Sequence, residues 1–479
     1  MPACSSPRTP RTPSGTPPPN RCACSSSACP PRCTSCTSRR SPRSGPPARG
    51  WTPTPSRRCA AATTSTRSPR FATSRPPPPP TGRRRRPEHK AAQMTTDRSS
   101  MDKIPLTHAS LGERELAAVA EVFASGWPAG QGPSGKALEA GLKERYGAGG
   151  AVAVSNCGAA LHLALLALGV KPGDEVIVAD YTFPAPAHAV RYLDAVPVFA
   201  DVRADTGTVD AQAVAALVTP RTVGIIAVDT VGIPADYTEL QAIADRHQLF
   251  LIEDAACAVG ATYQGRPAGA LAEVACLSFH GRKGASSGEG GALIATDPDI
   301  AAAARRRASF GIGSIFDQGQ VIGLPIPEFL EIGYNYKLSD IAAAIMQVQL
   351  ERLEEFIAHR SAVAARYGEL LADEELLTVP HVPADRTHAW QSYMVTLAKG
   401  VDRAAVATDL RAANIGSFHG TWASHVQPAF ESKQVCPVSA DLFQRNLGIP
   451  MHAELTMSQT ERVAEVLRKA VRAHTTPRT

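Results

Sequence analysis

The sequence predicts an α/β protein with a largely parallel sheet covered by helices on both faces, followed by a smaller α+β unit. From residue 150 onward, short apolar runs alternate with helical patterns. Many of these runs lack the in/out alternation of a half-exposed sheet, which favours strands buried on both faces. Beyond residue 360 the pattern changes to shorter mixed elements. We therefore expect an N-terminal extension over residues 1–100, a large domain over 101–355 and a small C-terminal domain over 356–479.

Seven apolar runs predict the seven strands of the sheet. They lie at 151–155, 175–180, 196–201, 223–229, 249–254, 274–279 and 291–296. A helical lead-in at 112–126 precedes them, and helical patterns at 159–168 and 237–247 lie between them. One long amphipathic helix is expected at 339–360, before the smaller unit begins.

The net charge of +6 conceals two unlike parts of the chain. Residues 1–93 carry 18 Lys and Arg against one acid, whereas the remainder carries 32 basic and 43 acidic residues. The part expected to fold is therefore acidic, and the charge gives no support to nucleic-acid binding.

The first 93 residues hold 21 of the 40 prolines and few apolar residues, so we expect disorder there. Cys33 and Cys36 form a CxxC pair, but no second pair follows at the spacing of a zinc finger. A transit peptide would share the Arg and Ser content, yet amphipathic periodicity is lacking. The composition looks like an out-of-frame reading of GC-rich DNA, with the true start at Met94 or Met101, and we expect it to carry no function.

Seven of the 11 cysteines lie before residue 60, and the remaining four are scattered, at Cys157, Cys257, Cys276 and Cys436. Their distribution fits a reducing, cytoplasmic compartment rather than a disulfide framework. No run of 18 apolar residues occurs, so we expect no membrane span. We also expect no metal site.

Several predicted strands end in an aspartate, including Asp229 and Asp254. In open α/β sheets, ligands bind beyond the carboxyl ends of the strands, so these positions are the first candidates for chemistry. An isolated Asp254 would be interpreted as a helix cap. The turn at 155–159, between a strand and a helix, offers backbone N–H groups that suit a phosphate.

A lone lysine, Lys283, lies among small polar residues in "SFHGRKGASSGEGG". Taken singly it could be a surface lysine, and Phe183 could be a core residue. Together with Asp254, Ser278 and the 155–159 turn, however, they supply every part of a pyridoxal phosphate (PLP) pocket. These parts are an amine for the Schiff base, an anion for the pyridine nitrogen, a phosphate cradle and a flat ring for stacking.

The chain resembles the DegT-type sugar aminotransferases, a branch of the aspartate-aminotransferase-like (fold-type I) PLP enzymes. The resemblance extends over roughly residues 104–475 and includes "SNCGAALHLALLALGVKPGDEVIVADYTF", "IEDAACAVGATYQGRPAG", "LSFHGRKGASSGEGGALIATD" and "GYNYKLSDIAAAIMQVQLERLEEF". It implies the fold-type I architecture and a PLP-dependent aminotransferase.

The resemblance also assigns roles to individual residues. Lys283 matches the lysine that bonds the cofactor, Asp254 the partner of the pyridine nitrogen, Phe183 the stacking aromatic and Ser278 a phosphate ligand. Two further groups matched to phosphate contacts are the backbone of Gly158 and Ala159 and the side chain of Asn335. The last residue comes from the neighbouring subunit, which implies a homodimer with a shared site.

The chain departs from the family pattern near the site. Cys257 stands where many relatives have glutamine beside the pyridine ring, so we include it among the cofactor-binding residues. Cys157 stands where glycine is common, and Gly158 where threonine is common. Asp229 falls where relatives usually carry histidine, which makes it a substrate-side candidate.

The implied reaction moves an amino group from glutamate or glutamine to a keto-sugar, in antibiotic or polysaccharide biosynthesis. The resemblance favours a nucleotide-linked 4-keto-6-deoxyhexose as the acceptor. One alternative is a ketocyclitol of the scyllo-inosose type. Two others are a PLP-fold sugar dehydratase, in which histidine replaces the lysine, and a non-catalytic regulator. The presence of Lys283 with Asp254 argues against both of these.

Overall fold

The computed structural model describes residues 103–313 and 328–475. The expectations for residues 1–93, and the proposed starts at Met94 and Met101, lie outside the described residues. The described elements belong to one compact unit of the chain.

The seven expected strands form one sheet, in the order β1-β10-β9-β6-β5-β2-β4. Only β10 runs against its neighbours, so the prediction of a mostly parallel sheet is confirmed. The strands are β1 (Gly150–Val154), β2 (Glu175–Ala179), β4 (Val196–Ala200), β5 (Thr222–Val228), β6 (Phe250–Asp254), β9 (Val274–Ser278) and β10 (Gly291–Ala295).

Apolar side chains on both faces of the sheet explain the uninterrupted apolar runs. Ile226 and Ile252 pack in the cluster that contains α3 (Cys157–Ala167) and α7 (Pro298–Ala308). Their neighbours Ile225 and Leu251 pack in a different cluster, which contains α6 (Tyr237–His247). Because adjacent residues of a strand point to opposite faces, the sheet is covered on both sides.

Shorter elements complete the large unit and its connection to the C-terminal part. They are α1 (Glu113–Ser125), α2 (Pro133–Tyr146), β3 (Tyr181–Thr182), α4 (Ala185–Arg191), α5 (Ala211–Leu217), β7 (Thr262–Tyr263), β8 (Arg266–Pro267), β13 (Trp422–Ala423) and α11 (Pro437–Arg445).

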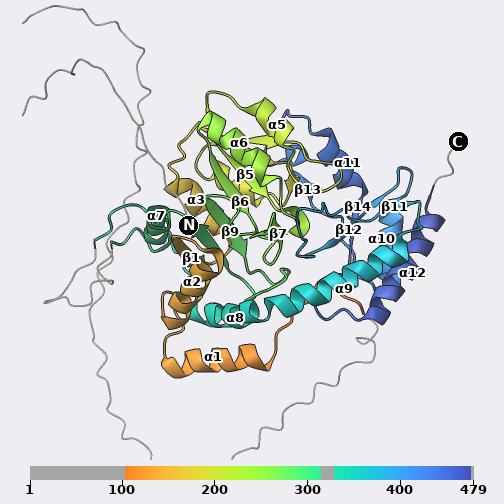
Figure 1. The fold of residues 1–479 in the computed structure, drawn as a ribbon, viewed down its shortest axis with the longest axis horizontal. Helices are drawn as coiled ribbons and strands as arrows, with labels where there is room; N and C mark the ends of the chain where they lie inside the picture. Colours follow the sequence, from red (N-terminus) through yellow and green to blue (C-terminus); the bar gives the residue numbers. More distant parts are fainter. Residues whose placement is uncertain (1–102, 314–327, 476–479) are drawn as a thin grey trace, which may run out of the picture. The chain divides into compact units, whose positions relative to one another are not determined.

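The single long helix expected at 339–360 is wrong in one respect, because two helices occupy this region. They are α8 (Asp340–Glu351) and α9 (Leu353–Leu371), drawn in cyan below the large sheet in Figure 1, with α1 below α8. The first helix ends at Glu351 and is followed by Arg352, whose guanidinium donates a hydrogen bond to Glu115 of α1 at 3.0 Å. A contact with a segment more than 200 residues away therefore accompanies the break.

The C-terminal unit has its own sheet and its own core. Strands β11 (Leu377–Thr378), β12 (Tyr393–Leu397) and β14 (Asn446–Ile449) are antiparallel. The helices α9, α10 (Arg403–Ala412) and α12 (Met457–Ala473) contribute to the same core as this sheet. Ile104, near the start of the described chain, also packs there. The boundaries 1–100, 101–355 and 356–479 remain our proposal.

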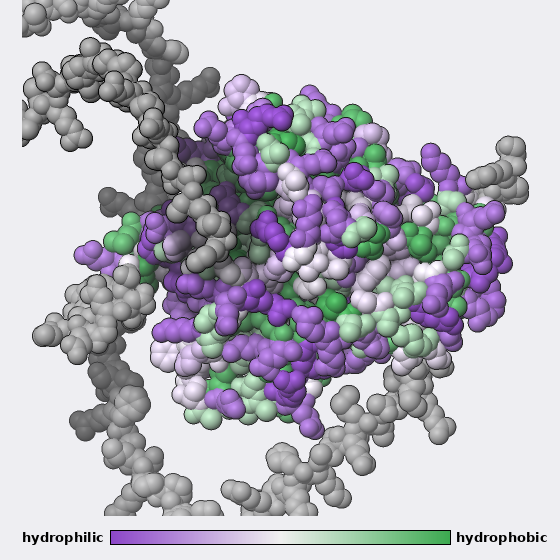
Figure 2. Space-filling view, in the orientation of Figure 1, coloured by the Kyte–Doolittle hydropathy of each residue, from purple (hydrophilic) through white to green (hydrophobic). Residues whose placement is uncertain are grey.

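Among the residues that the structure describes, no helix is both long enough and apolar enough to cross a membrane. The face drawn in Figure 2 is largely hydrophilic, with smaller apolar patches between the polar groups.

Candidate active site

Asp254 lies at the carboxyl end of β6 and is only 4% exposed. Its Oδ1 accepts a hydrogen bond from the Ala256 N–H at 3.1 Å and lies 3.7 Å from the Cys157 sulfur. Among the described residues, none donates a hydrogen bond to Oδ2. Burial raises the pKa of Asp254, although the Ala256 amide and Lys283 oppose this effect. The carboxylate thus has one oxygen available for a cationic partner.

Lys283 lies in the loop between β9 and β10, where its backbone N–H bonds the His280 carbonyl at 2.8 Å. Its Nζ lies 3.0 Å from the Sγ of Cys257, in the turn that follows Asp254. Burial lowers the pKa of Lys283, but the neighbouring Cys257 and Asp254 outweigh this effect and raise it. The amine and the carboxylate, predicted from separate motifs, are therefore brought to the same end of the sheet.

A buried arginine holds the loop that carries this lysine. Arg360, from α9, is 2% exposed and donates from Nη1 to the carbonyl of Gly284 at 2.8 Å. A Cβ atom at residue 284 would lie 2.4 Å from that nitrogen. The small residue next to Lys283 therefore leaves room for the close approach of the guanidinium. Sequence reasoning missed Arg360, because an arginine in an amphipathic helix is usually a surface residue.

The start of α3 supplies part of the expected phosphate cradle. The Ala159 N–H already donates to the Oδ1 of Asn156 at 2.8 Å, in a helix cap. Within the described chain, the N–H groups of Cys157 and Gly158 have no acceptor. Ser278 ends β9 and is buried, and its Oγ lies 3.4 Å from the backbone nitrogen of His280. In this structure Gly158 offers a free donor, whereas Ala159 would first have to release Asn156.

Phe183 follows β3, and its ring is 60% exposed. It contacts the edge of Trp422 with ring centroids 5.3 Å apart. An aromatic ring this exposed retains a face for stacking. Trp422 comes from the C-terminal part of the chain, which the sequence motifs did not connect with Phe183.

Asn335 is exposed and accepts a hydrogen bond from the Nζ of Lys337 at 2.5 Å. In the described part of the chain, no hydrogen bond joins Asn335 to Lys283, Asp254 or Ser278. Its own chain therefore does not engage its side chain with these three residues.

Asp229 has contacts unlike those expected of a substrate-side residue. Its side chain is fully buried, and its Oδ1 accepts hydrogen bonds from the Tyr237 hydroxyl at 2.9 Å and the Ala235 N–H at 3.1 Å. Burial raises the pKa of Asp229, and the adjacent Glu253 raises it further. These contacts join the end of β5 to the start of α6, and within the described residues the Oδ2 of Asp229 has no hydrogen-bond partner.

A pair of polar residues that the sequence motifs did not connect joins the two parts of the chain. The carboxylate of Asp180 accepts bonds from the backbone N–H of His425 at 2.7 Å and pairs with its Nδ1 at 2.6 Å. Cys436 places its sulfur close to both, so the three ligand atoms lie within 4.8 Å of one another. The two short bonds account for both oxygens of Asp180, and we assign the pair to the attachment of the 421–436 segment.

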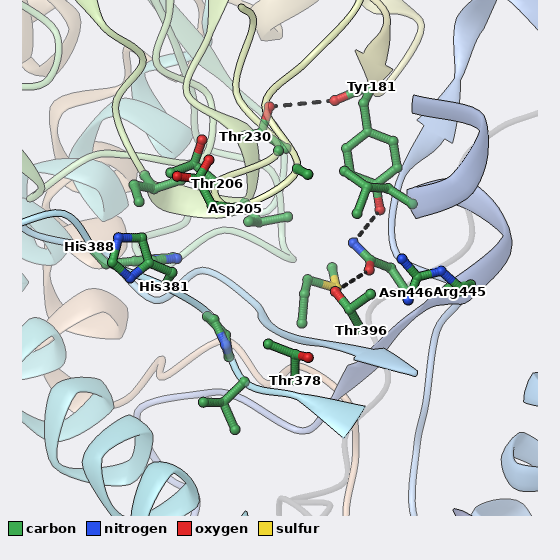
Figure 3. Close-up of a pocket in the computed structure, with 18 residues that line it drawn as sticks. Tyr181, Asp205, Thr206, Thr230, Thr378, His381, His388, Thr396, Arg445 and Asn446 are labelled. Atoms are coloured by element: carbon green, nitrogen blue, oxygen red, sulfur yellow. Dashed lines mark hydrogen bonds between the residues drawn. The ribbon is translucent and has the colours of Figure 1, made fainter. Parts of the chain in front are cut away.

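A cavity of about 270 Å³ lies beside this attachment, as drawn in Figure 3. Tyr181 lies along one side of it, where its hydroxyl accepts a bond from Asn446 at 2.8 Å and its carbonyl accepts one from Thr230 at 3.5 Å. None of the predicted site residues lines this cavity. It is therefore separate from the lysine site.

The arrangement around Lys283 fits PLP. The free oxygen of Asp254, the amine, the open ring of Phe183 and the unpaired N–H groups at the start of α3 match the chemical groups of this cofactor. The fold and this site define the class of protein as a PLP-dependent aminotransferase.

Comparisons with known proteins agree with this class. The profile of the DegT/DnrJ/EryC1/StrS aminotransferase family matches residues 109–468. The aminotransferase TlmJ from Streptoalloteichus hindustanus is 34% identical, with 78% of this chain and 99% of TlmJ covered at a TM-score of 0.72. A DegT DnrJ EryC1 StrS aminotransferase from Brucella abortus is 31% identical, with 75% of this chain and 95% of that protein covered at a TM-score of 0.68. The fold is shared with Helicobacter pylori PseC, an aminotransferase involved in the biosynthesis of pseudoaminic acid. The identity is 22%, and 78% of this chain and 100% of PseC are covered at a TM-score of 0.72.

The chain belongs to the DegT/DnrJ/EryC1/StrS aminotransferase family.

Proposed function

We propose that the protein transfers an amino group from glutamate or glutamine to a keto-sugar, in particular a nucleotide-linked 4-keto-6-deoxyhexose. The observation that carries the aminotransferase chemistry is the joint placement of the Lys283 amine and the free oxygen of Asp254 at one end of the sheet. Family membership supports the sugar as the acceptor class. Bound PLP would supply an electron sink that makes a carbon–hydrogen bond next to the amino group acidic.

The residues of the chain divide the work. Lys283 holds the cofactor and then moves a proton between two carbon atoms as a general acid and base. Asp254 keeps the pyridine nitrogen protonated. Ser278 and the N–H groups of Cys157 and Gly158 hold the phosphate at the positive end of the α3 dipole.

An aromatic wall next to Phe183 supports a substrate with a sizeable apolar face. Trp422 contacts the ring of Phe183, and both Phe418 and His419 contact Trp422, with centroids 5.6 and 4.8 Å apart. A 6-deoxyhexose carries a methyl group and an apolar ring face, and such groups pack well on aromatic rings. A ketocyclitol lacks the methyl group and the nucleotide.

The acceptor can be identified in the second half of the reaction. Protein carrying the aminated cofactor would be mixed with nucleotide-linked 4-keto-6-deoxyhexoses and with scyllo-inosose, and the products identified by mass spectrometry. We expect amino-sugar formation with the nucleotide-linked acceptors. Amination of scyllo-inosose alone would move the assignment to a ketocyclitol. Release of a dehydrated sugar without amine would instead indicate a dehydratase.

We also propose a homodimer in which Asn335 reaches the phosphate of the neighbouring subunit. Apolar side chains around Asn335 and on α1 are exposed, as expected of a surface covered by a second copy. They are Leu116, Phe123, Trp127, Phe310, Phe329, Leu330 and Ile332, between 46% and 88% exposed.

Subunit mixing tests the shared site. Lys283→Ala and Asn335→Ala would be prepared with different tags and allowed to exchange subunits. In a two-fold dimer one site of each hybrid inherits both defects and the other inherits neither. Random mixing makes about half of the dimers hybrid, so about a quarter of all sites should have wild-type activity. Confirmed exchange without any gain in activity would show that Asn335 serves its own subunit.

A further inference from the structure

The lysine amine has a sulfur neighbour. The Cys257 Sγ lies 3.0 Å from the Nζ of Lys283, and no other side chain within the described residues makes a hydrogen bond to this nitrogen. Cys257 is a free thiol and is half-buried. The family resemblance led us to expect this residue beside the pyridine ring, where many relatives have glutamine. In the structure it contacts the reacting amine.

We propose that Cys257 is an acid–base partner of Lys283 in the amino-group transfer. The sulfur takes a proton from the lysine and returns it while the lysine is detached from the cofactor. In this step an ammonium and a thiolate become an amine and a thiol. One N–H bond breaks, one S–H bond forms, and no electrons are transferred to another group. The inference rests on the role of Lys283 proposed above.

The other ionisable groups that face the amine are less suited to this exchange. Asp254 is hydrogen-bonded to Ala256 and is needed by the pyridine nitrogen. The Cys157 sulfur lies against Asp254 instead, and burial, with Asp254, raises the pKa of Cys157 well above its usual value. Of the groups that raise the pKa of Lys283, Cys257 has the largest effect.

The exchange would serve the chemistry of the lysine. Lys283 must be neutral to remove a proton from carbon and must carry a proton to deliver one. A thiol at 3.0 Å can store that proton without exchange with solvent. Glutamine cannot take up a proton in this way, so the feature would distinguish this chain from relatives with glutamine at the position.

Labelling of cofactor-free protein with cyanate tests the inference without any turnover. Cyanate reacts with neutral amines, and peptide mass spectrometry reports Lys283 separately from the exposed Lys171. Burial lowers the pKa of Lys283, and Cys257 is one of the neighbours that oppose this effect. Removal of the Cys257 thiol should therefore lower the pKa of Lys283. A lower pKa raises the fraction of the amine that is neutral. We therefore expect labelling of Lys283 at about pH 8.5 to rise severalfold in Cys257→Ala and in Cys257→Ser.

The serine variant separates proton exchange from hydrogen bonding. Serine retains a hydrogen-bond acceptor of similar size but does not ionise at this pH, so parental labelling of Lys283 in Cys257→Ser would overturn the proposal. Cys276→Ala is the matched control, because Cys276 is a buried thiol in β9 with no bond to Lys283, and it should label like the parent. If Cys257→Ala fails to fold, Cys257→Ser decides alone.

The loaded enzyme offers a second readout. We expect Cys257→Ser to lower kcat about tenfold, less than the roughly 10²–10⁴-fold of a direct acid–base group because Cys257 acts through Lys283, while the KM for the amino donor stays within about twofold. An unchanged kcat, or a raised KM with unchanged kcat, would contradict the proposal. If the proposed role of Lys283 were wrong, the result would differ, because replacement of a different lysine would then abolish covalent binding of the cofactor.

Discussion

Asp254 and Asp229 follow adjacent parallel strands, yet the structure predicts opposite consequences for their replacement. Asp254→Asn retains an oxygen that can accept the Ala256 N–H. It removes the negative charge that would pair with the pyridine nitrogen. A hydrogen bond to a charged group contributes about 1.5–3 kcal/mol, and 1.4 kcal/mol corresponds to a factor of ten in affinity. We therefore expect PLP to bind roughly 10- to 150-fold more weakly.

The same substitution should leave the cofactor-free fold intact. Asp254 is buried, and its pKa is raised mainly because burial disfavours the charged form. A neutral amide avoids this cost, so the free energy of unfolding should stay within about 1 kcal/mol of the parent or increase. Urea unfolding of cofactor-free protein measures the stability, and equilibrium dialysis measures the affinity for PLP.

Asp229→Ala is the matched control, because Asp229 is equally buried at the neighbouring strand end. It leaves the Tyr237 hydroxyl and the Ala235 N–H without their acceptor. Each buried unsatisfied group costs about 1–3 kcal/mol, so the free energy of unfolding should fall by roughly 2–6 kcal/mol. PLP affinity should change less than about threefold, which is below 1 kcal/mol. The reasoning fails if Asp254→Asn binds PLP like the parent, or if Asp229→Ala loses PLP at unchanged stability.

Two further predictions concern the groups that surround the lysine loop. Gly284→Ala places a Cβ 2.4 Å from the Arg360 guanidinium, so it should lower the free energy of unfolding by about 1–3 kcal/mol and reduce covalent PLP. In the control Gly281→Ala the nearest neighbour lies at 3.7 Å, and the free energy of unfolding should stay within about 0.5 kcal/mol of the wild type. Equal urea midpoints for the two variants would contradict this. Burial, with the nearby Arg360, lowers the pKa of His388 to about 3, so the unfolded chain takes up a proton below pH 6.5 that the folded chain excludes. Stability should therefore fall by roughly 2 kcal/mol between pH 6.5 and 5, and His388→Gln should reduce this loss; an identical pH dependence in both proteins would refute it.

The strands of the large sheet could be predicted from the sequence because their burial is a local property. Most of these strands are buried on both faces, so their apolar runs are uninterrupted and their limits are visible. The break at Arg352 could not be predicted in this way. The apolar period continues through it, and the contact with Glu115 involves a residue of a distant helix.

The site residues also divide into those with a local sequence signal and those whose contacts depend on tertiary packing. Lys283, Asp254 and Phe183 could be singled out as candidates from the sequence because each has a distinctive residue type at the end of a strand or in a loop. Asp229 shares that signal, but its contacts depend on how Tyr237 folds back onto it. Arg360 and the bond between Cys257 and Lys283 depend on tertiary packing, so no local pattern indicated them.

The central claim is that Lys283 is the residue that holds the cofactor covalently. Reduction of PLP-loaded protein with borohydride fixes the cofactor to its lysine, and peptide mass spectrometry then locates it. We expect a single modified lysine, Lys283, and no modification in Lys283→Ala. Modification of a different lysine, or none in protein that contains PLP, would contradict the claim.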